Sequence, residues 1–267
     1  MDEYIIHSDA KEIFKSIDSS FDRLMDMQGE VYRELEGRST QRIKILDKFY
    51  FIKKHTGVGW REVIKNLLQL KLPVVSAKNE YVALSKLKKL KINVPNIIAF
   101  GNRGNNPAKI NSFILTDELP KYISLEDFCK YWPNCPPSFH FKHMLIKEIA
   151  KISRIMHFHG INHRDYYICH LLLDVKDLIN SKIKLYLIDL HRAMVNKVVS
   201  NRWLAKDLSA LYFSSKNIGL TKRDILRFIK EYQNKPLKVS LKKDLNFWLK
   251  VGKRGDKLFR KKGQLKS

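Results

Sequence analysis

The hydrophobic pattern divides the chain into a strand-rich first part and a helix-rich second part. Segments 30–45 and 48–55 are rich in β-branched and aromatic residues, and they are interrupted at Gly37 and at Asp47-Lys48. This pattern predicts three antiparallel strands in a meander. Segments 96–101 and 112–119 are short apolar runs between turn-forming residues, and they predict two further strands.

Helical periodicity appears twice in the first part, at residues 60–70 before Pro73 and at about residues 79–90. The apolar positions that define the two faces are Ile64, Leu67, Leu68 and Leu70 in the first helix and Ala83, Leu87 and Leu90 in the second. Because such faces usually pack on a core, we predict a sheet with helices packed on it.

From Ser124 onwards the pattern is mainly helical. Ser124 and Asp127 resemble a capping box, and a long amphipathic helix ends near Gly160. Residues 171–173 and 184–189 predict short buried strands, residues 203–213 predict a helix, and Thr221 with Asp224 predicts the start of another helix. A small strand-rich lobe, residues 1–118, therefore precedes a helix-rich lobe, residues 119–267, and the two together form one domain.

Length and charge narrow the classes of protein that the chain can belong to. At 267 residues and 44% hydrophobic composition it can bury a substantial core, which excludes a disordered chain. Lys and Arg number 51 against 27 Asp and Glu, a net charge of +24. The electric field of this charge favours binding of an anionic partner, which could be nucleic acid, an anionic membrane, phosphorylated small molecules or an acidic protein. Residues 242–267 carry +8 of that charge, either as a solvated tail or as a docking surface.

The sequence shows neither the pattern of a signal peptide nor that of a transmembrane helix. The start "MDEYIIHSDAKEIF" has acids where a signal peptide has basic residues, and no run of about 18 apolar residues occurs. We therefore expect a cytoplasmic protein without a transmembrane helix. The three cysteines lack CxxC spacing, which argues against a disulfide framework and a structural zinc site.

Candidate chemistry centres on "INHRDYYICHLLLDV", residues 161–175. His163, Arg164 and Asp165 match the H-R-D triplet of the protein-kinase catalytic loop, in which the acid orients the acceptor hydroxyl. Asp189 lies 24 residues later at the end of "KLYLID", where the magnesium-binding acid of that plan belongs. The triplet and the later acid predict phosphoryl transfer.

The same plan requires a lysine on the third strand of the small lobe and a glutamate on a helix. Lys53 in "FYFIKK" and Glu80 near the start of the second helix take these positions. Lys53 could instead be a strand-end lysine, because Lys54 is an alternative that faces the other way. Glu80 could be a first-turn acid favoured by the helix dipole.

Two departures from the kinase plan concern the metal and the phosphate loop. His170 stands where the loop has Asn, and imidazole is a poor magnesium ligand, so either one metal suffices or His170 orients the loop by hydrogen bonding. Asp189 is followed by Leu190-His191 in place of Phe-Gly. The glycine-rich loop is reduced to Gly37, which leaves Arg38, Ser39 and backbone amides to contact phosphate.

With these residues in place, the chain resembles the lipopolysaccharide core heptose I kinases of Gram-negative bacteria, members of the protein-kinase-like superfamily. The segments that carry the resemblance are "QGEVYRELEGR", "ISLEDFC", "MLIKEIA", "GINHRDYYICH", "IDLHRA" and "KDLSALYFSSKNIGLTKRDILRF". The resemblance covers nearly the whole chain and implies an α+β, two-lobed protein-kinase-like fold with an antiparallel sheet in the first lobe. The departure at His170 is expected in that family.

The resemblance implies transfer of the ATP γ-phosphate, with Mg²⁺, to the position-four hydroxyl of the first heptose of a lipid A-linked acceptor at the inner membrane. It also suggests an acyl carrier protein as partner, and no nucleic acid. The candidate residues are Asp165, Arg164 and His163 for catalysis, Lys53, Glu80, Gly37, Arg38 and Glu118 for ATP, and Asp189 and His170 for the metal. The alternatives are a protein kinase and a non-catalytic kinase-like module that binds nucleic acid or an acidic protein.

Overall fold

The computed structural model describes residues 2–7, 10, 13–15, 19–35, 37–68, 73–119, 121–179 and 182–264. The chain forms two compact units. Unit 1 comprises residues 1–86 and 95–120, and unit 2 comprises residues 87–94 and 121–267. The division lies near the predicted boundary at residue 118, but residues 87–94 go with unit 2. There Asn93 accepts a hydrogen bond from the Leu187 backbone N–H at 3.0 Å.

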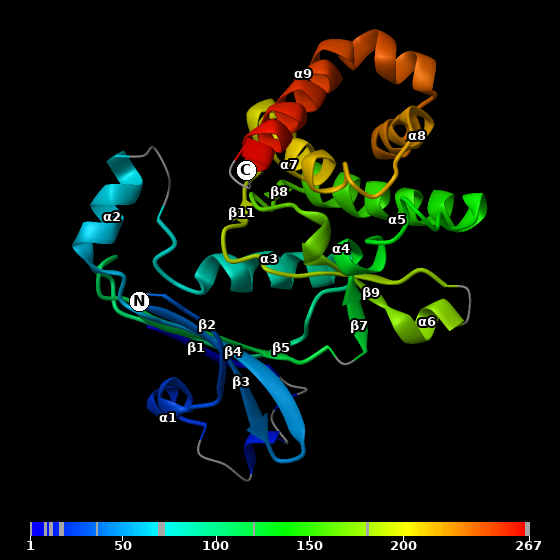
Figure 1. Ribbon diagram of the computed structural model, residues 1–267. Helices are drawn as coiled ribbons and strands as arrows, with labels where there is room; N and C mark the ends of the chain where they lie inside the picture. Colours follow the sequence, from blue (N-terminus) through cyan, green and yellow to red (C-terminus); the bar gives the residue numbers. More distant parts are fainter. Residues whose placement is uncertain are drawn as a thin grey trace. The chain divides into compact units, whose positions relative to one another are not determined.

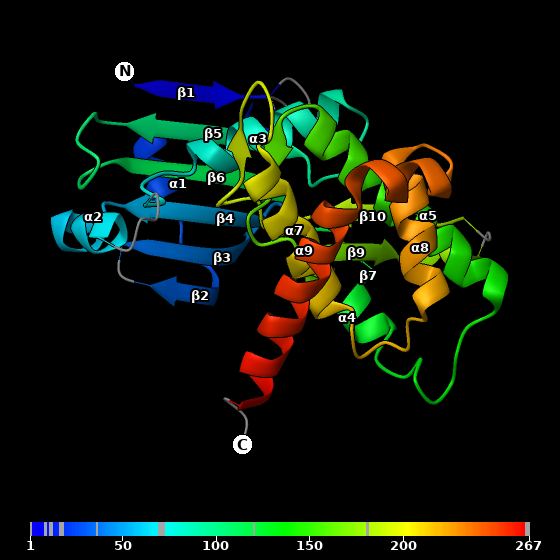
Figure 2. The ribbon, with the colours of Figure 1, turned by 90° about the horizontal axis from the view of Figure 1, so that it is seen from above.

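Unit 1 is built on an antiparallel sheet of six strands in the order β1-β5-β6-β4-β3-β2, which Figure 2 shows from above. The strands are β1 (Glu3–Ile6), β2 (Glu30–Leu35), β3 (Arg38–Ile45), β4 (Lys48–Thr56), β5 (Ile97–Arg103) and β6 (Asn111–Asp117). The meander β2-β3-β4 and the pair β5-β6 confirm the five strands predicted from sequence. Strand β1, which pairs with β5, was not predicted.

The two faces of this sheet carry different helices (Figure 1). On one face, α1 (Phe21–Asp26) contributes Phe21 and Leu24 to the core of unit 1. A short 3-10 helix (Ile13–Lys15) adds to the same side. On the other face, α3 (Lys78–Lys89) stacks Tyr81 on Phe100 of β5, with the ring centroids 4.2 Å apart. The core of unit 1 thus lies between the sheet and α1, while α3 covers the opposite side.

Helix α2 (Gly59–Leu68) forms where helical periodicity predicted it, but its packing differs from the expectation. Val63 is buried, whereas Ile64, Leu67 and Leu68 are exposed. Leu70, the last apolar position of the predicted face, lies outside the described residues. The expectation that this face packs on the sheet is therefore wrong for the residues described.

Unit 2 is mainly helical, as predicted. Its helices are α4 (Leu125–Phe128), α5 (Phe139–Phe158), a 3-10 helix (Ile168–His170), α6 (Val175–Ile179), α7 (Asn201–Ser214), α8 (Lys222–Gln233) and α9 (Leu237–Gln264). Its strands are β7 (Tyr122–Ser124), β8 (Ile161–Asn162), β9 (Leu171–Asp174), β10 (Leu185–Leu187) and β11 (Met194–Val195). The predicted capping box at Thr221 and Asp224 is present at the start of α8.

The core of unit 2 joins α7, α8 and α9 through Leu208, Ile229, Trp248 and Val251. The basic C-terminal segment is thus largely a helix docked on its unit. None of the helices in the described part of the chain has both the length and the apolar character that a membrane crossing requires.

Candidate active site

Lys53 and Glu80 form an ion pair in unit 1. Lys53 lies in β4 and Glu80 in the first turn of α3, and the Lys53 Nζ and Glu80 Oε1 atoms are 2.6 Å apart. The Glu80 side chain is buried and the Lys53 side chain is partly exposed. The structure thus brings together the two residues that the sequence assigned to a phosphate clamp.

Lys54, the alternative lysine, points to the other face of the sheet, as strand alternation requires. It is buried, and its ammonium group donates a hydrogen bond to the Met27 backbone oxygen. Burial lowers the pKa of Lys54. A lysine enclosed beside α1 cannot reach a ligand on the α3 side, so Lys53 is the lysine with the geometry of a clamp.

Gly37 and Arg38 lie at the turn between β2 and β3. Gly37 has φ +69°, and a Cβ there would lie 2.2 Å from the Gly57 backbone oxygen, so the turn requires a residue without a side chain. Arg38 begins β3, two residues before Thr40, which is the register partner of Lys53. Alternate residues of a strand share a face, so Arg38 and Lys53 lie on the same face of the sheet.

Glu118 lies farther along the same unit. Its carboxylate accepts two hydrogen bonds from the Arg42 guanidinium, at 2.7 and 3.0 Å, and its backbone N–H donates to the Phe49 carbonyl oxygen. The Glu118 hydrogen bond raises the pKa of Arg42. Among the ATP candidates, Glu118 is therefore anchored near the start of β4, by an ion pair of its own with Arg42.

The catalytic-loop triplet of unit 2 is held by Asp207 of α7. This fully buried carboxylate accepts hydrogen bonds from the backbone N–H groups of His163 and Arg164, at 2.7 and 2.9 Å. His157 of α5 lies 3.3 Å from the same carboxylate. Arg164 has φ +72°, a conformation that costs free energy for a non-glycine residue. The Asp207 hydrogen bonds hold the backbone that presents Asp165.

His163 connects this loop to the segment that carries Asp189. Its Nε2 atom lies 3.0 Å from the Ile188 carbonyl oxygen, and the ring is completely buried. Burial lowers the pKa of His163, which favours the neutral ring. The neutral ring donates its Nε2–H to the Ile188 oxygen, so His163 is a buried connector between the two candidate acids.

His170 has both ring nitrogens directed at protein oxygens. Its Nδ1 atom lies 2.7 Å from the Asp165 backbone oxygen, and its Nε2 atom lies 3.4 Å from Asp189 Oδ2. A metal ligand would need one of these nitrogens. The geometry therefore favours the role that the sequence suggested for His170, which is to orient the loop by hydrogen bonding.

Asp189 also has φ +60° and sits between two histidines. His191 Nδ1 lies 2.5 Å from its Oδ1 atom, whereas His170 approaches Oδ2. Magnesium in phosphoryl-transfer sites is usually held by one or two carboxylates together with substrate phosphates and water. Asp189 offers one partly exposed carboxylate, which fits such an ion, whereas the imidazole of His170 does not.

Arg192 completes the group in unit 2. Its Nη1 atom lies 3.1 and 3.3 Å from the two carboxylate oxygens of Asp165. The Arg164 guanidinium lies over the Trp203 ring, 4.7 Å from its centroid, so it supports the loop from the side of α7. Arg192 is thus the cation that meets the Asp165 carboxylate directly.

Sequence reasoning assigned no role to Asp207 or Arg192. Both lie in segments that carried the family resemblance, "KDLSALYF" and "IDLHRA", so a signal existed. Their roles depend on hydrogen bonds to residues 43 and 27 positions away, respectively, which no local pattern encodes.

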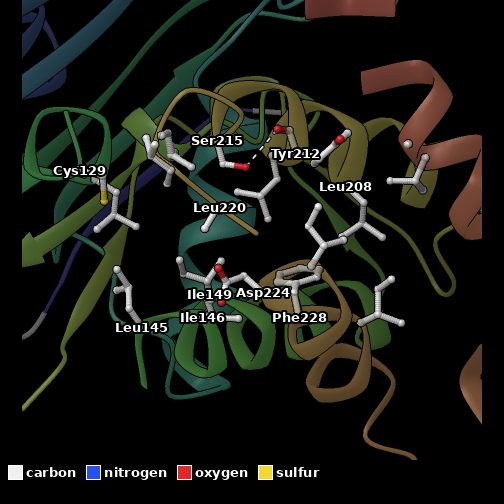
Figure 3. A pocket seen from close by; sticks show the side chains of 18 of the residues that line it. Cys129, Leu145, Ile146, Ile149, Leu208, Tyr212, Ser215, Leu220, Asp224 and Phe228 are labelled. Carbon is white, nitrogen blue, oxygen red and sulfur yellow. Dashed lines mark hydrogen bonds between the residues drawn. The ribbon is translucent and has the colours of Figure 1, made fainter. Parts of the chain in front are cut away.

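Unit 2 also encloses an apolar cavity of about 200 Å³ (Figure 3). In Figure 3, Leu145, Ile146 and Ile149 of α5 and Phe228 of α8 lie along one side of it and Leu208 of α7 lies on the other, while Trp248 of α9 adds to the lining. One hydroxyl of the lining is satisfied locally, because Ser215 Oγ donates to the Tyr212 carbonyl oxygen. An apolar molecule or chain would fit this lining.

Comparison with known proteins gives concordant matches. The model of the lipopolysaccharide kinase (Kdo/WaaP) family matches residues 22–232. The chain is 48% identical over 225 residues to the lipopolysaccharide core heptose(I) kinase WaaP of Escherichia coli, covering 84% of this chain and 85% of the relative. It is 42% identical over 243 residues to the enzyme of the same name from Pseudomonas aeruginosa, covering 91% of each.

A solved structure described as WaaP in complex with acyl carrier protein is also similar. Its TM-score is 0.81 at 35% identity, and the match covers 96% of this chain and 99% of that one. These matches confirm the resemblance drawn from the sequence and the α+β, kinase-like fold class.

Proposed function

Because the chain belongs to the lipopolysaccharide kinase (Kdo/WaaP) family, we propose that it transfers the γ-phosphate of ATP to the first heptose of the lipopolysaccharide inner core. The observation that carries this proposal is the identity of 42–48% with curated heptose(I) kinases over most of the chain. The position-four hydroxyl is the acceptor atom that we propose. The lipid A anchor of such an acceptor would place the enzyme at the inner face of the inner membrane.

In unit 1, we assign Lys53 to the α- and β-phosphates of ATP and Glu80 to holding the lysine in place. The 2.6 Å ion pair supports this assignment, because it fixes the ammonium on the α3 face of the sheet. Arg38 shares that face, and together with the backbone at Gly37 it would contact phosphate oxygens. Glu118 would act through its backbone at the end of the sheet, since Arg42 already engages its carboxylate.

In unit 2, we assign Asp165 to the acceptor. Its carboxylate would accept the proton of the heptose hydroxyl as the new O–P bond forms and the bond from the γ-phosphorus to ADP breaks. Arg192 would hold the carboxylate in the orientation that this transfer requires. Asp189 would hold a magnesium ion, whose chemistry when bound is to offset phosphate charge.

The decisive experiment incubates purified protein with ATP and heptosylated lipopolysaccharide and follows phosphate incorporation by mass. We expect one added phosphate with the wild type and none with Asp165→Ala, while ATP binding by that variant stays within about twofold because the phosphate clamp is intact. Asp127→Ala, at the cap of α4, is the matched control and should keep its turnover. Normal turnover by Asp165→Ala would refute the assignment.

An acyl carrier protein is the partner that we propose, because the similar solved structure is described as a complex with one. Carrier proteins of this class are acidic, and α9 presents Lys250, Lys253, Arg254 and Lys257 around one hollow. The apolar cavity beside α9 would receive the acyl chain, each buried methylene group contributing about 0.8 kcal/mol. Charge and cavity together support a partner that carries both an acidic surface and an acyl chain.

This partnership predicts that the acyl group matters. We expect acylated carrier protein to bind at least tenfold more tightly than carrier protein without the acyl chain, measured by calorimetry. Ile146→Trp, which fills the cavity, should remove that difference, whereas Lys253→Glu should weaken binding of both forms. Equal binding of both forms to the wild type would count against the cavity as the acyl site.

The two alternative functions have no specific support among the described residues. The aromatic residues of the basic tail, which a nucleic-acid module would expose, are packed: Trp248 is buried, and Phe259 lies 6.5 Å from the Phe213 ring. The segment after Asp189 leads through β11 directly to α7. We therefore keep the sugar kinase as the single proposed function.

A further inference from the structure

Helix α2 exposes a large apolar face that nothing in the described part of unit 1 covers. Trp60, Ile64, Leu67 and Leu68 recur at helical spacing on one side of the helix, and they are 53%, 50%, 52% and 80% exposed. Val63 is the one buried side chain among those that the structure describes in α2. In Figure 1 the helix, in cyan, stands off the sheet beyond the end of β4.

This exposure cannot be attributed to a generally apolar surface. Helix α3, which begins in the same unit, buries its apolar positions Ala83 and Leu84 completely or nearly so, as a packed amphipathic helix should. Four large apolar side chains gathered on one exposed helix face are unusual for a protein surface and mark an interaction site.

The flanks of the exposed face are basic. Arg61 and Lys65 follow the apolar positions around the helix, and both are exposed. Glu62 is the one acid of the helix, and it pairs with Lys65 at 3.4 Å. A short helix with Trp and Leu on one face, basic residues beside it and little net hydrophobicity is typical of helices that lie in the interface of a membrane. The charge of the whole chain, +24, is complementary to an anionic bilayer.

We propose that α2 inserts its apolar face into the interface of an anionic membrane, with Arg61 and Lys65 at the level of the lipid phosphates. Trp60 would lie at the boundary between headgroups and acyl chains, where tryptophan is enriched. This inference rests on the proposed function, because the acceptor of that reaction is a membrane-anchored glycolipid. Docking through α2 would bring the enzyme to the surface where its acceptor lies.

The first test measures binding to vesicles and does not depend on catalysis. The full chain is sedimented with vesicles of phosphatidylethanolamine and phosphatidylglycerol, and with vesicles of phosphatidylcholine alone. We expect binding to the anionic vesicles, weakened at least tenfold by Leu67→Ser/Leu68→Ser. The matched control is Phe158→Ser, a single change at a residue 82% exposed at the end of α5 in unit 2, which should bind as the wild type does.

A second readout locates the helix. Vesicles with brominated acyl chains should quench part of the tryptophan fluorescence of the wild type, and Trp60→Phe should abolish this quenching. Two of the other three tryptophans, Trp132 and Trp248, are buried in unit 2. Quenching that Trp60→Phe leaves unchanged, or vesicle binding that Leu67→Ser/Leu68→Ser leaves unchanged, would overturn the proposal.

The catalytic arm separates this proposal from the proposed function. The wild type is assayed with acceptor embedded in vesicles and with the soluble core oligosaccharide lacking lipid chains. We expect Leu67→Ser/Leu68→Ser to lower turnover of the embedded acceptor about tenfold and to leave the soluble acceptor unchanged. An equal loss with both acceptors would overturn the membrane role of α2. A wild type that phosphorylates neither acceptor would instead refute the proposed function and leave the vesicle binding result to stand alone.

Discussion

Replacing Asp207 by alanine tests how the catalytic loop is held. The carboxylate accepts two hydrogen bonds from the backbone N–H groups of His163 and Arg164. A buried donor that loses its partner costs about 1–3 kcal/mol. His163 is completely buried and Arg164 partly exposed, so we take the middle of this range for the first and its lower end for the second. We therefore expect Asp207→Ala to lower the free energy of unfolding by about 3 kcal/mol.

The assay is urea unfolding followed by tryptophan fluorescence. Three of the four tryptophans, Trp132, Trp203 and Trp248, belong to unit 2, so the signal reports mainly the unit in which Asp207 lies. Asp256→Ala is a matched control, because its carboxylate makes a partly exposed ion pair with Lys216 on the same unit. That variant should change the free energy of unfolding by less than about 1 kcal/mol.

Activity provides the second half of the test. The two hydrogen bonds position the backbone just before Asp165, so kcat of Asp207→Ala should fall at least about a hundredfold. Asp207→Asn keeps the shape and one acceptor oxygen but turns its amide N–H₂ group towards the other backbone donor. It should therefore recover only part of the stability and activity. A value of kcat within twofold of the wild type for Asp207→Ala, or a loss of stability no larger than that of Asp256→Ala, would refute the reasoning.

Three further predictions concern other contacts. Lys53→Met should abolish turnover and lower the free energy of unfolding by about 3 kcal/mol, because it leaves the buried Glu80 carboxylate unpaired; adding Glu80→Gln should restore the stability but not the turnover. Arg192→Ala should lower kcat about tenfold or more with little change in the KM for ATP, because it frees the catalytic-loop carboxylate, and an equal change in both constants would contradict this role. Burial alone would raise the pKa of Asp224, but hydrogen bonds from Thr221 and a nearby lysine lower it. The stabilisation from ionised Asp224 is therefore present above the ordinary carboxyl pKa of 3.8 and is lost as the pH falls through the lower pKa of the folded state. In urea titrations Asp224→Asn should destabilise the protein at neutral pH and less below pH 3.8, and a cost that does not depend on pH would contradict it.

The parts of the fold that the sequence predicted are those with local causes. The meander follows from turn residues between β-rich segments, and the start of α8 follows from Thr221 and Asp224 within one helical turn. Strand β1 could not be found in this way. It is four residues long, and its partner β5 begins at Ile97, so only the tertiary fold gives Glu3–Ile6 a reason to be extended.

In the candidate site, too, the sequence predicted the residues with a local signal and missed those defined by tertiary contacts. His163, Arg164 and Asp165 are adjacent letters, and Asp189 ends a visible strand, so the sequence could indicate all four. The sequence left open which face of β4 meets α3. It therefore could not decide whether Lys53 or Lys54 pairs with Glu80. Asp207 acts through backbone N–H groups of another element, and no letter in α7 signals that contact.

Helix α2 marks the limit of periodicity as evidence for packing. The spacing of Ile64, Leu67 and Leu68 predicts an apolar face as well as the spacing in α3 does. A helical backbone places residues three and four apart on the same face, whether or not anything packs against it. What covers the face is a separate question, which the sequence does not answer. In α3 Ala83 and Leu84 are buried, and Tyr81 stacks on Phe100 of the sheet. In α2 the same kind of face is exposed beside Arg61 and Lys65. A face that is apolar by sequence and left uncovered by the described residues of its own unit calls for another occupant, and the basic flanks favour an anionic lipid surface over an apolar protein groove.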